Sequence, residues 1–246
     1  MAANSNKCLY CGSTDNGFSS VEHILPESLG NKQLILPKGI VCDVCNNGVL
    51  AQLDNCLLEF EIIKFLRVYF RIPNKAGQYP EGKFGNMKMR VTPTGIHVDI
   101  DKLTKKHYVP GPVQPDHSIK FTLNMRGKKD TVAWRKKFAR SLYKIGLGIL
   151  CLQDAEFAYS GRFDEVRQII LGKQDFSGYF ILRASTPTPN GHITHRLLGA
   201  PDGDNIVMFQ VNLFGTEFVF DFEQRRIIGE RPDPLPDDLY IFEWDQ

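Results

Sequence analysis

Apolar residues recur at helical spacing in two parts of the chain. Residues 57–70 form the first, and Pro73 ends the pattern because proline cannot continue a helix. Its spaced apolar positions are Leu58, Ile62, Phe65, Leu66 and Tyr69. The second and clearer pattern covers about residues 130–150, where Asp130 or Thr131 can cap the start. Its apolar face consists of Trp134, Phe138, Leu142, Ile145 and Ile149.

Strand patterns dominate the C-terminal third of the chain. Four segments rich in β-branched and aromatic residues follow residue 177 and are separated by turns of Pro, Asn and Gly. They are residues 179–182, 192–198, 206–213 and 217–222. A short helix over 163–172, with Gly172 at its end, precedes them. Helices followed by a run of strands predict an α+β protein in which helices pack on an antiparallel sheet.

The N-terminal patterns are shorter and predict a strand, a second strand and a helix. Residues 18–24 predict a short strand, with β-branched and aromatic residues, that Pro26 ends. Residues 34–41 predict an interrupted second strand, and residues 46–53 predict a helix. With the segments rich in glycine and proline, these patterns divide the chain into three expected regions. They are a module at 1–55, a helix with a connector at 56–115, and an α+β region at 116–246.

Composition adds little to this picture. The chain has 246 residues, 42% of them apolar and 24% charged, as is ordinary for a soluble globular protein. The net charge of +2 indicates no partner by itself. No apolar run approaches the roughly 18 residues of a membrane span, and the first residues lack the apolar core of a signal peptide. We therefore expect a cytoplasmic protein without a membrane partner.

Local charge is more informative than net charge. Residues 120–144 carry nine Lys or Arg residues and one acid, Asp130. Three of the basic residues, Lys136, Arg140 and Lys144, recur at helical spacing away from the apolar face. Such a stripe can hold the phosphates of a nucleic acid, and it can equally be an ordinary solvated helix face. The sequence leaves both interpretations open.

Four cysteines form two Cys-x-x-Cys pairs, Cys8 with Cys11 and Cys42 with Cys45. Thiols stay reduced inside cells, so such pairs are typical of metal ligands rather than disulfides. Four thiolates complete a tetrahedral zinc site with no open position for water, which predicts a structural zinc ion. Its binding energy would stabilise a small module. Cys56 and Cys151 stand alone, and we expect them to be buried apolar residues.

An acid and a histidine, Glu22 and His23, lie between the two cysteine pairs, and Asn46 directly follows the last cysteine. Carboxylate and amide oxygens suit a hard ion such as Mg²⁺ or Mn²⁺. However, neighbouring residues of a strand point to opposite faces. Glu22 and His23 can therefore share one site only where the strand bends or ends, which Pro26 permits. Alone, such a pair is more often a surface pair than a site.

Together these segments resemble the HNH endonuclease family, in particular its zinc-stapled ββα-metal branch, also called the His-Me finger. The resemblance covers residues 8 to about 54. It implies that the four cysteines hold the zinc staple and that His23 is the general base. It further implies that Glu22 and Asn46 hold the catalytic Mg²⁺ or Mn²⁺, with Asn47 as the rival of Asn46.

One position departs from the family pattern. The middle asparagine of the family usually precedes the third cysteine by about five residues and braces the loop; Pro37 stands there instead. Asn31 is the nearest asparagine, and the sequence does not settle whether it takes that role.

The resemblance implies a metal-dependent endonuclease that hydrolyses phosphodiester bonds in DNA and leaves 5′-phosphate and 3′-hydroxyl ends. RNA is an equally open substrate from the sequence. The family serves in restriction, defence and mobile-element cutting, so we expect one of these roles. The alternative is a zinc-stapled module that binds nucleic acid or protein without cutting it. The oligomeric state stays open, a homodimer included.

Overall fold

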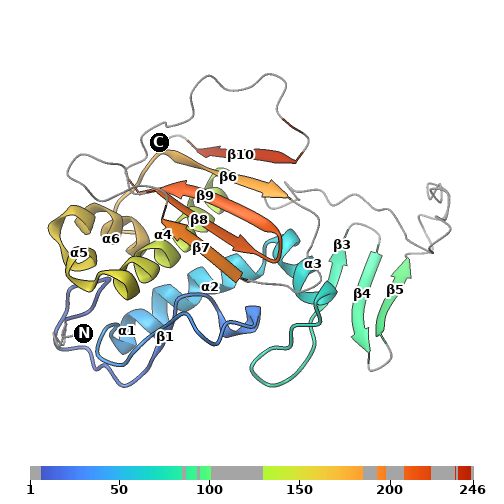
Figure 1. The fold of residues 1–246 in the computed structure, drawn as a ribbon, viewed down its shortest axis with the longest axis horizontal. Coiled ribbons are helices and arrows are strands. Elements are labelled where there is room, and N and C mark those ends of the chain that lie inside the picture. The colour runs from blue at the N-terminus through green and yellow to red at the C-terminus, as the bar shows by residue number, and fades with distance from the viewer. Residues whose placement is uncertain are drawn as a thin grey trace.

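A computed structural model describes residues 7–84, 87–92, 95–100, 130–184, 193–197, 208–222, 236 and 238–244. A long helix, α4 (Val132–Gln153), lies at the centre of the fold (Figure 1). A five-stranded sheet covers one side of α4, and the N-terminal segments lie on the other. Within the described ranges, no helix is both long and apolar enough to cross a membrane. The linker and strand predicted within residues 109–123 lie outside these ranges.

The N-terminal segments form a short hairpin and a continuous helical stretch. Strands β1 (Glu22–His23) and β2 (Ile35–Leu36) pair antiparallel, and a 3₁₀ turn, η1 (Glu27–Leu29), lies in the connection. After the second cysteine pair the backbone passes from α1 (Asp43–Cys45) through a π-helical turn, η2 (Asn46–Leu50), into α2 (Ala51–Leu58). The predicted order of strand, strand and helix is confirmed, although both strands are shorter than the sequence indicated.

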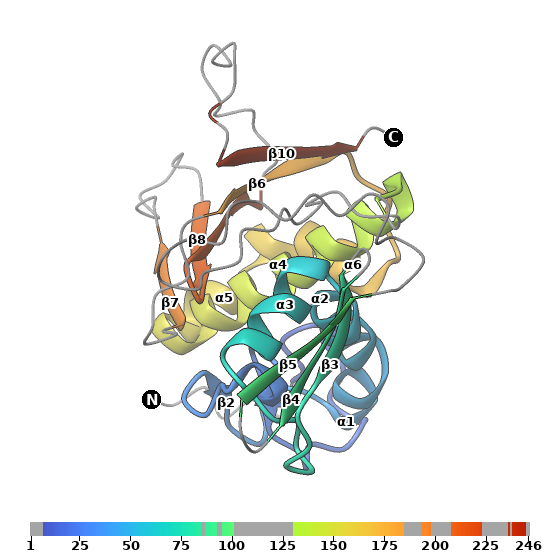
Figure 2. The same ribbon diagram turned by 90° about the vertical axis from the view of Figure 1, so that its right-hand side faces the viewer.

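A second helix and a three-stranded sheet follow. Helix α3 (Glu61–Tyr69) buries Ile62, Phe65 and Leu66 of the apolar face predicted for residues 57–70. The helix begins only after a break at Phe60, so Leu58 belongs to α2, and Tyr69 is exposed. Strands β3 (Glu81–Phe84), β4 (Met87–Thr92) and β5 (Gly95–Ile100) form an antiparallel sheet in the order β3-β4-β5. Figure 2 shows this sheet standing beside α3, where the rings of Phe65 and Phe84 meet edge to face.

The start of α4 and the end of α6 are set by local sequence signals. The Thr131 side chain accepts a hydrogen bond from the backbone N–H of Trp134, which confirms the predicted cap. Three short elements follow: α5 (Ala155–Tyr159), a 3₁₀ turn η4 (Gly161–Phe163) and α6 (Asp164–Leu171). Helix α6 ends at Gly172, whose φ of 72° is the left-handed conformation that glycine adopts most easily.

The large sheet is antiparallel throughout, in the order β10-β6-β9-β8-β7. Its strands are β6 (Gly178–Ala184), β7 (Ile193–Leu197), β8 (Met208–Leu213), β9 (Thr216–Asp221) and β10 (Leu239–Trp244). Four of them were predicted. Strand β10 was not, because it lies after a proline-rich stretch and adds to the edge of the sheet beside β6.

Aromatic side chains join α4 to the sheet. The Phe138 ring lies 5.0 Å from that of Phe180 and 5.7 Å from that of Phe218. Gly146 lets the helix approach closely, since a Cβ there would lie 2.9 Å from the ring of Phe220. The buried residues form one hydrophobic core that runs from Cys8 to Trp244. The predicted class, helices packed on an antiparallel sheet, is confirmed, whereas the three-region division stays a prediction.

Candidate metal centre and active site

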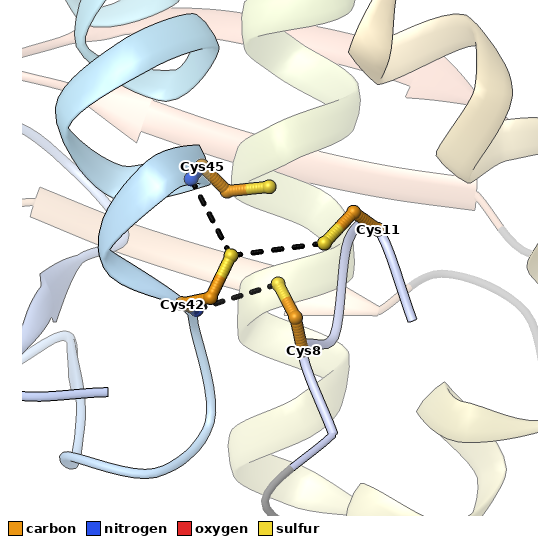
Figure 3. A group of neighbouring side chains, drawn as sticks. All are labelled: Cys8, Cys11, Cys42 and Cys45. Carbon is orange, nitrogen blue, oxygen red and sulfur yellow. Dashed lines mark hydrogen bonds between the residues drawn. The ribbon is translucent and has the colours of Figure 1, made fainter. Parts of the chain in front are cut away.

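The four cysteines converge at one point, as Figure 3 shows. Cys8 and Cys11 lie in a tight N-terminal turn, and Cys42 and Cys45 bracket the start of α1. All four sulfur atoms lie within 4.8 Å of one another, and those of Cys11 and Cys42 are 3.7 Å apart. Zinc–sulfur bonds of about 2.3 Å in a tetrahedron place the sulfurs roughly 3.8 Å apart. The geometry therefore suits zinc.

Contacts within the cluster lower the pKa of Cys8 and raise that of Cys45, so Cys8 is the cysteine most favoured as a thiolate. The backbone N–H of Cys42 donates to the sulfur of Cys8, at 3.4 Å. Contact with Cys45 is the main cause that lowers the pKa of Cys8 to about 5. Three of the four residues are buried and Cys11 is partly buried. Four soft thiolates without an open position can hold a structural zinc ion, as the cysteine spacing predicted. Cys56 and Cys151 are buried, as expected.

Glu22 and His23 lie side by side on β1 and point to opposite faces of it. Glu22 pairs with Leu36 across the hairpin and His23 pairs with Ile35. The Glu22 residue is 2% exposed, whereas the His23 side chain is 21% exposed. The alternation of a strand thus turns the carboxylate inward and the imidazole outward. That Glu22, His23 and Asn46 act at one centre stays a prediction.

The inward carboxylate meets a buried lysine. Lys144 of α4 is fully buried, and its Nζ lies 2.5 Å from Glu22 Oε1 and 2.8 Å from Asp54 Oδ1. The same ammonium donates to the carbonyl oxygens of His23, at 2.9 Å, and Ile24, at 3.2 Å. Burial acts to lower the pKa of Lys144, but Asp54 and Glu22 outweigh it and the pKa is raised. The ammonium is therefore charged at neutral pH.

The His23 side chain is partly buried and lies next to an exposed ion pair between Glu27 and Lys75. Its Nε2 lies 4.0 Å from Glu27 Oε2, and the same Glu27 oxygen lies 3.5 Å from Lys75 Nζ. Its Nδ1 is buried without a hydrogen-bond partner among the described groups. Burial, then Lys75 and Lys144, lower the pKa of His23, and Glu27 only partly opposes them. The imidazole is therefore neutral at pH 7, as a general base requires.

Asn46 is held against the hairpin. Its Nδ2 donates to Ser20 Oγ, at 3.1 Å, and to the carbonyl oxygen of Val21, at 2.8 Å. The amide oxygen, Oδ1, has no hydrogen bond within the described part of the chain and is the atom that can bind a hard cation. Asn47 is exposed by contrast. Asn46 thus lies next to the residue that precedes Glu22, with its oxygen available.

The donor atoms suit Mg²⁺ or Mn²⁺ with one restriction. A carboxylate and an amide oxygen are the hard ligands these ions prefer. Glu22, however, uses Oε1 for Lys144, so only Oε2 is left for an ion. Among His, Cys, Asp and Glu side chains of the described residues, the group that converges as metal ligands is the cysteine cluster.

Asn31 braces the connection between β1 and β2. Its Nδ2 donates to the carbonyl oxygens of Leu25, at 2.8 Å, and Leu34, at 3.0 Å. Its Oδ1 accepts from the backbone N–H groups of Gln33, at 3.2 Å, and Leu34, at 2.9 Å. The residue is 4% exposed. These contacts are those of a loop brace, which the sequence left unassigned because the spacing to Cys42 differs from the family pattern.

The three basic residues of the α4 stripe, Lys136, Arg140 and Lys144, do not form a common exposed surface. Lys144 is buried in the ion cluster just described. Arg140 donates from Nε and Nη2 to the carbonyl oxygen of Ile170, at 3.1 and 2.8 Å. Lys136 pairs with Asp175 at 2.6 Å, and its side chain is 18% exposed. The physical reason is that α4 has packed elements around it, so its polar side also faces protein.

Sequence reasoning did not name Asp54, and it named Lys144 only as part of the basic stripe. Asp54 is the one acid between Val49 and Leu58, and Lys144 is the one charge between Ser141 and Leu152. A charge that is buried within an apolar helical stretch must be paired. That composition was the available signal.

Comparison with known proteins agrees with the N-terminal geometry. Residues 8–59 match the family model described as HNH endonuclease. No curated protein matches the chain, and no solved structure matches it either. The matched segment contains the cysteine cluster, the β1–β2 hairpin and helix α2. Residues 8–59 therefore form an HNH-type region with a cysteine cluster that can hold zinc.

Proposed function

We propose that this protein is a metal-dependent endonuclease that hydrolyses phosphodiester bonds in DNA. The observation that carries the proposal is the position and the lowered pKa of His23. Within a segment that matches the HNH endonuclease family, this histidine has a lowered pKa and lies on a hairpin next to the cysteine cluster. A neutral imidazole held there is suited to proton transfer at pH 7.

His23 takes a proton from the attacking water. In the neutral ring one nitrogen carries the proton, and the lone pair of the other is the acceptor. Lys75 and Lys144 disfavour the imidazolium before attack, because both lower the pKa of His23. Asn31 keeps the connection behind the imidazole in place.

Glu22, through Oε2, and Asn46, through Oδ1, are the residues that would hold a catalytic Mg²⁺ or Mn²⁺. Asn46 is preferred to Asn47 because its amide group is fixed against β1. Such an ion supplies charge stabilisation for the phosphate and the leaving 3′ oxygen. The zinc ion at the four cysteines is structural, since it leaves no position for water or substrate.

A specific observation supports a second candidate, a zinc-stapled module that binds nucleic acid or protein without cutting. Glu22 is engaged by Lys144, and strand alternation turns Glu22 inward and His23 outward. Under this candidate Glu22 is a purely structural carboxylate. The two candidates differ in whether His23 and a divalent ion matter to any reaction.

The test is incubation of the full chain, loaded with zinc, with supercoiled plasmid, linear duplex, single-stranded DNA and RNA. Each substrate is given Mg²⁺, Mn²⁺ or EDTA. Cleavage that requires the divalent ion, leaves 5′-phosphate ends and disappears in His23→Ala supports the proposal. Substrate retardation without cleavage under every condition would favour the binding module. Cleavage that persists in His23→Ala would remove this histidine from the mechanism.

A further inference from the structure

Lys144 lies outside the family match, which ends at residue 59, yet its ammonium contacts the strand that carries His23. Helix α4, which supplies it, belongs to the C-terminal part of the chain. Four oxygen atoms surround the ammonium: two from the carboxylates of Glu22 and Asp54, and two from the carbonyls of His23 and Ile24. An ammonium has three N–H groups, so every donor has an acceptor.

This contact is a fixed feature of the fold. The Lys144 side chain is 0% exposed, and α4 packs against α2, β2 and the large sheet. One turn further along α4, Gly148 allows a close approach to the hairpin, since a Cβ there would lie 2.9 Å from the Ile24 side chain. A lysine enclosed in this way cannot withdraw into solvent, so it does not exchange places with a metal ion.

The ammonium determines how Glu22 is presented. Without the ammonium, the buried Glu22 carboxylate would lose the charged group that holds its Oε1 and would be free to rotate. With Oε1 on the ammonium, Oε2 has a defined direction. The same ammonium holds the backbone of His23 through its carbonyl oxygen. Removal of a group that orients a metal-binding carboxylate in this manner typically lowers metal affinity or activity roughly 10- to 100-fold.

We propose that Lys144 is a positioning residue of the nuclease centre, which fixes the Glu22 carboxylate and the His23 backbone from outside the HNH-type region. The inference rests on the proposed function. Lys144 touches neither substrate nor ion in this role, and it acts through Glu22 and through the strand. The C-terminal part of the chain thereby completes the active site.

The first variant is Lys144→Met in the zinc-loaded full chain. We expect kcat on plasmid DNA to fall roughly 10- to 100-fold, while KM stays within about twofold because no substrate contact is lost. Mn²⁺ binding to the protein alone, followed by electron paramagnetic resonance, should weaken by a similar factor. A folded, zinc-containing variant with wild-type kcat and Mn²⁺ affinity would overturn the proposal, and so would tighter Mn²⁺ binding.

Arg135→Met is the matched control. Arg135 lies on the same helix and also binds an acid and a carbonyl oxygen, with contacts of 2.6 Å to Asp130 and 2.7 Å to the carbonyl oxygen of Glu243. It makes no described contact with β1. The control should lose stability but keep kcat and Mn²⁺ affinity within about twofold of wild type. The reason is that a substitution that makes no contact with the site changes stability independently of it. A loss equal to that of Lys144→Met would show a general effect of destabilising α4.

Lys144→Met leaves a buried carboxylate, Glu22, beside a partly buried one, Asp54, and can fail to fold. The double variant Asp54→Asn/Lys144→Met keeps the net charge of the cluster and is compared with Asp54→Asn. The same loss of kcat and Mn²⁺ affinity is expected between these two. A second pair of variants, Glu22→Gln and Glu22→Gln/Lys144→Met, measures the coupling between Lys144 and Glu22. Removal of Lys144 should lower kcat and Mn²⁺ affinity several-fold less when the Glu22 carboxylate is absent. Undiminished loss in that background would refute action through Glu22.

The failure of this inference and of the proposed function are distinguishable. If the wild-type chain cleaves no nucleic acid, the proposed function fails and the role of Lys144 falls with it. If wild type cleaves, His23→Ala does not, and folded Lys144 variants cleave normally, only the positioning role is refuted.

Discussion

Replacing Asn31 by alanine should loosen the loop that joins β1 to β2. The substitution removes four hydrogen bonds, two donated to carbonyl oxygens and two accepted from backbone N–H groups. Each such bond contributes about 0.5–1.5 kcal/mol net, and a buried group left unpaired costs about 1–3 kcal/mol. Water can replace the partners near Gln33, which is exposed, but not the one at Leu25, which is buried. We expect Asn31→Ala to lower the free energy of unfolding by about 2–4 kcal/mol.

Denaturant unfolding followed by tryptophan fluorescence and circular dichroism measures this change, and amide hydrogen exchange localises it. The amide of Leu34 should exchange faster, because it loses its acceptor. Asn31→Asp is the matched comparison: it keeps two acceptor contacts but places a charged oxygen against two carbonyl oxygens, so it should be at least as unstable. A decrease below about 0.5 kcal/mol for Asn31→Ala, with unchanged exchange at Leu34, would refute this account of the brace.

Three further predictions concern the metal, the histidine and the helix contact. Cys42→Ser or chelation should release zinc and unfold the N-terminal region, because structural zinc contributes about 10–16 kcal/mol of apparent binding energy. Zinc analysis together with thermal melting measures both effects. A zinc-free protein with an unchanged melting temperature would contradict this prediction. The pKa of His23 is lowered, so this base is protonated, and loses its function, only below about pH 6.5, which is the usual pKa of a histidine. A plot of cleavage rate against pH should therefore have the midpoint of its acid limb below that pH. A midpoint above it would contradict the assignment. Gly148→Ala should push on Ile24, 2.9 Å from the added Cβ, and lower both stability and cleavage, whereas unaltered values for both would mean that α4 and the hairpin adjust freely.

The elements that the sequence predicted well depend on neighbouring residues. The spacing of the cysteine pairs indicated the metal cluster, because two residues between ligands form a turn that aims both sulfurs at one ion. The cap at Thr131 and the left-handed stop at Gly172 are local backbone chemistry, and both helix limits followed from them. Four strands of the large sheet were visible for the same reason, since alternation and turn residues lie within one segment.

The residues of the candidate site were named from the sequence, and their joint role stays a prediction. Strand alternation already opposed a common direction for Glu22 and His23, and the hairpin register confirms that they face opposite sides. No local pattern indicated which element lies behind Glu22. Lys144 is 122 residues further along the chain, and its helical spacing with Lys136 and Arg140 is equally compatible with solvent and with a packed neighbour.

Sequence alone determined the cysteine cluster, the helix limits, the strand-rich C-terminal part and the candidacy of His23, because each is written in residues a few positions apart. Tertiary structure decided the addition of β10 beside β6, the burial of α4 between the sheet and the N-terminal hairpin, and the pairing of Lys144 with Glu22 and Asp54. The physical reason is that burial depends on what covers a residue. The elements that cover α4 come from both ends of the chain.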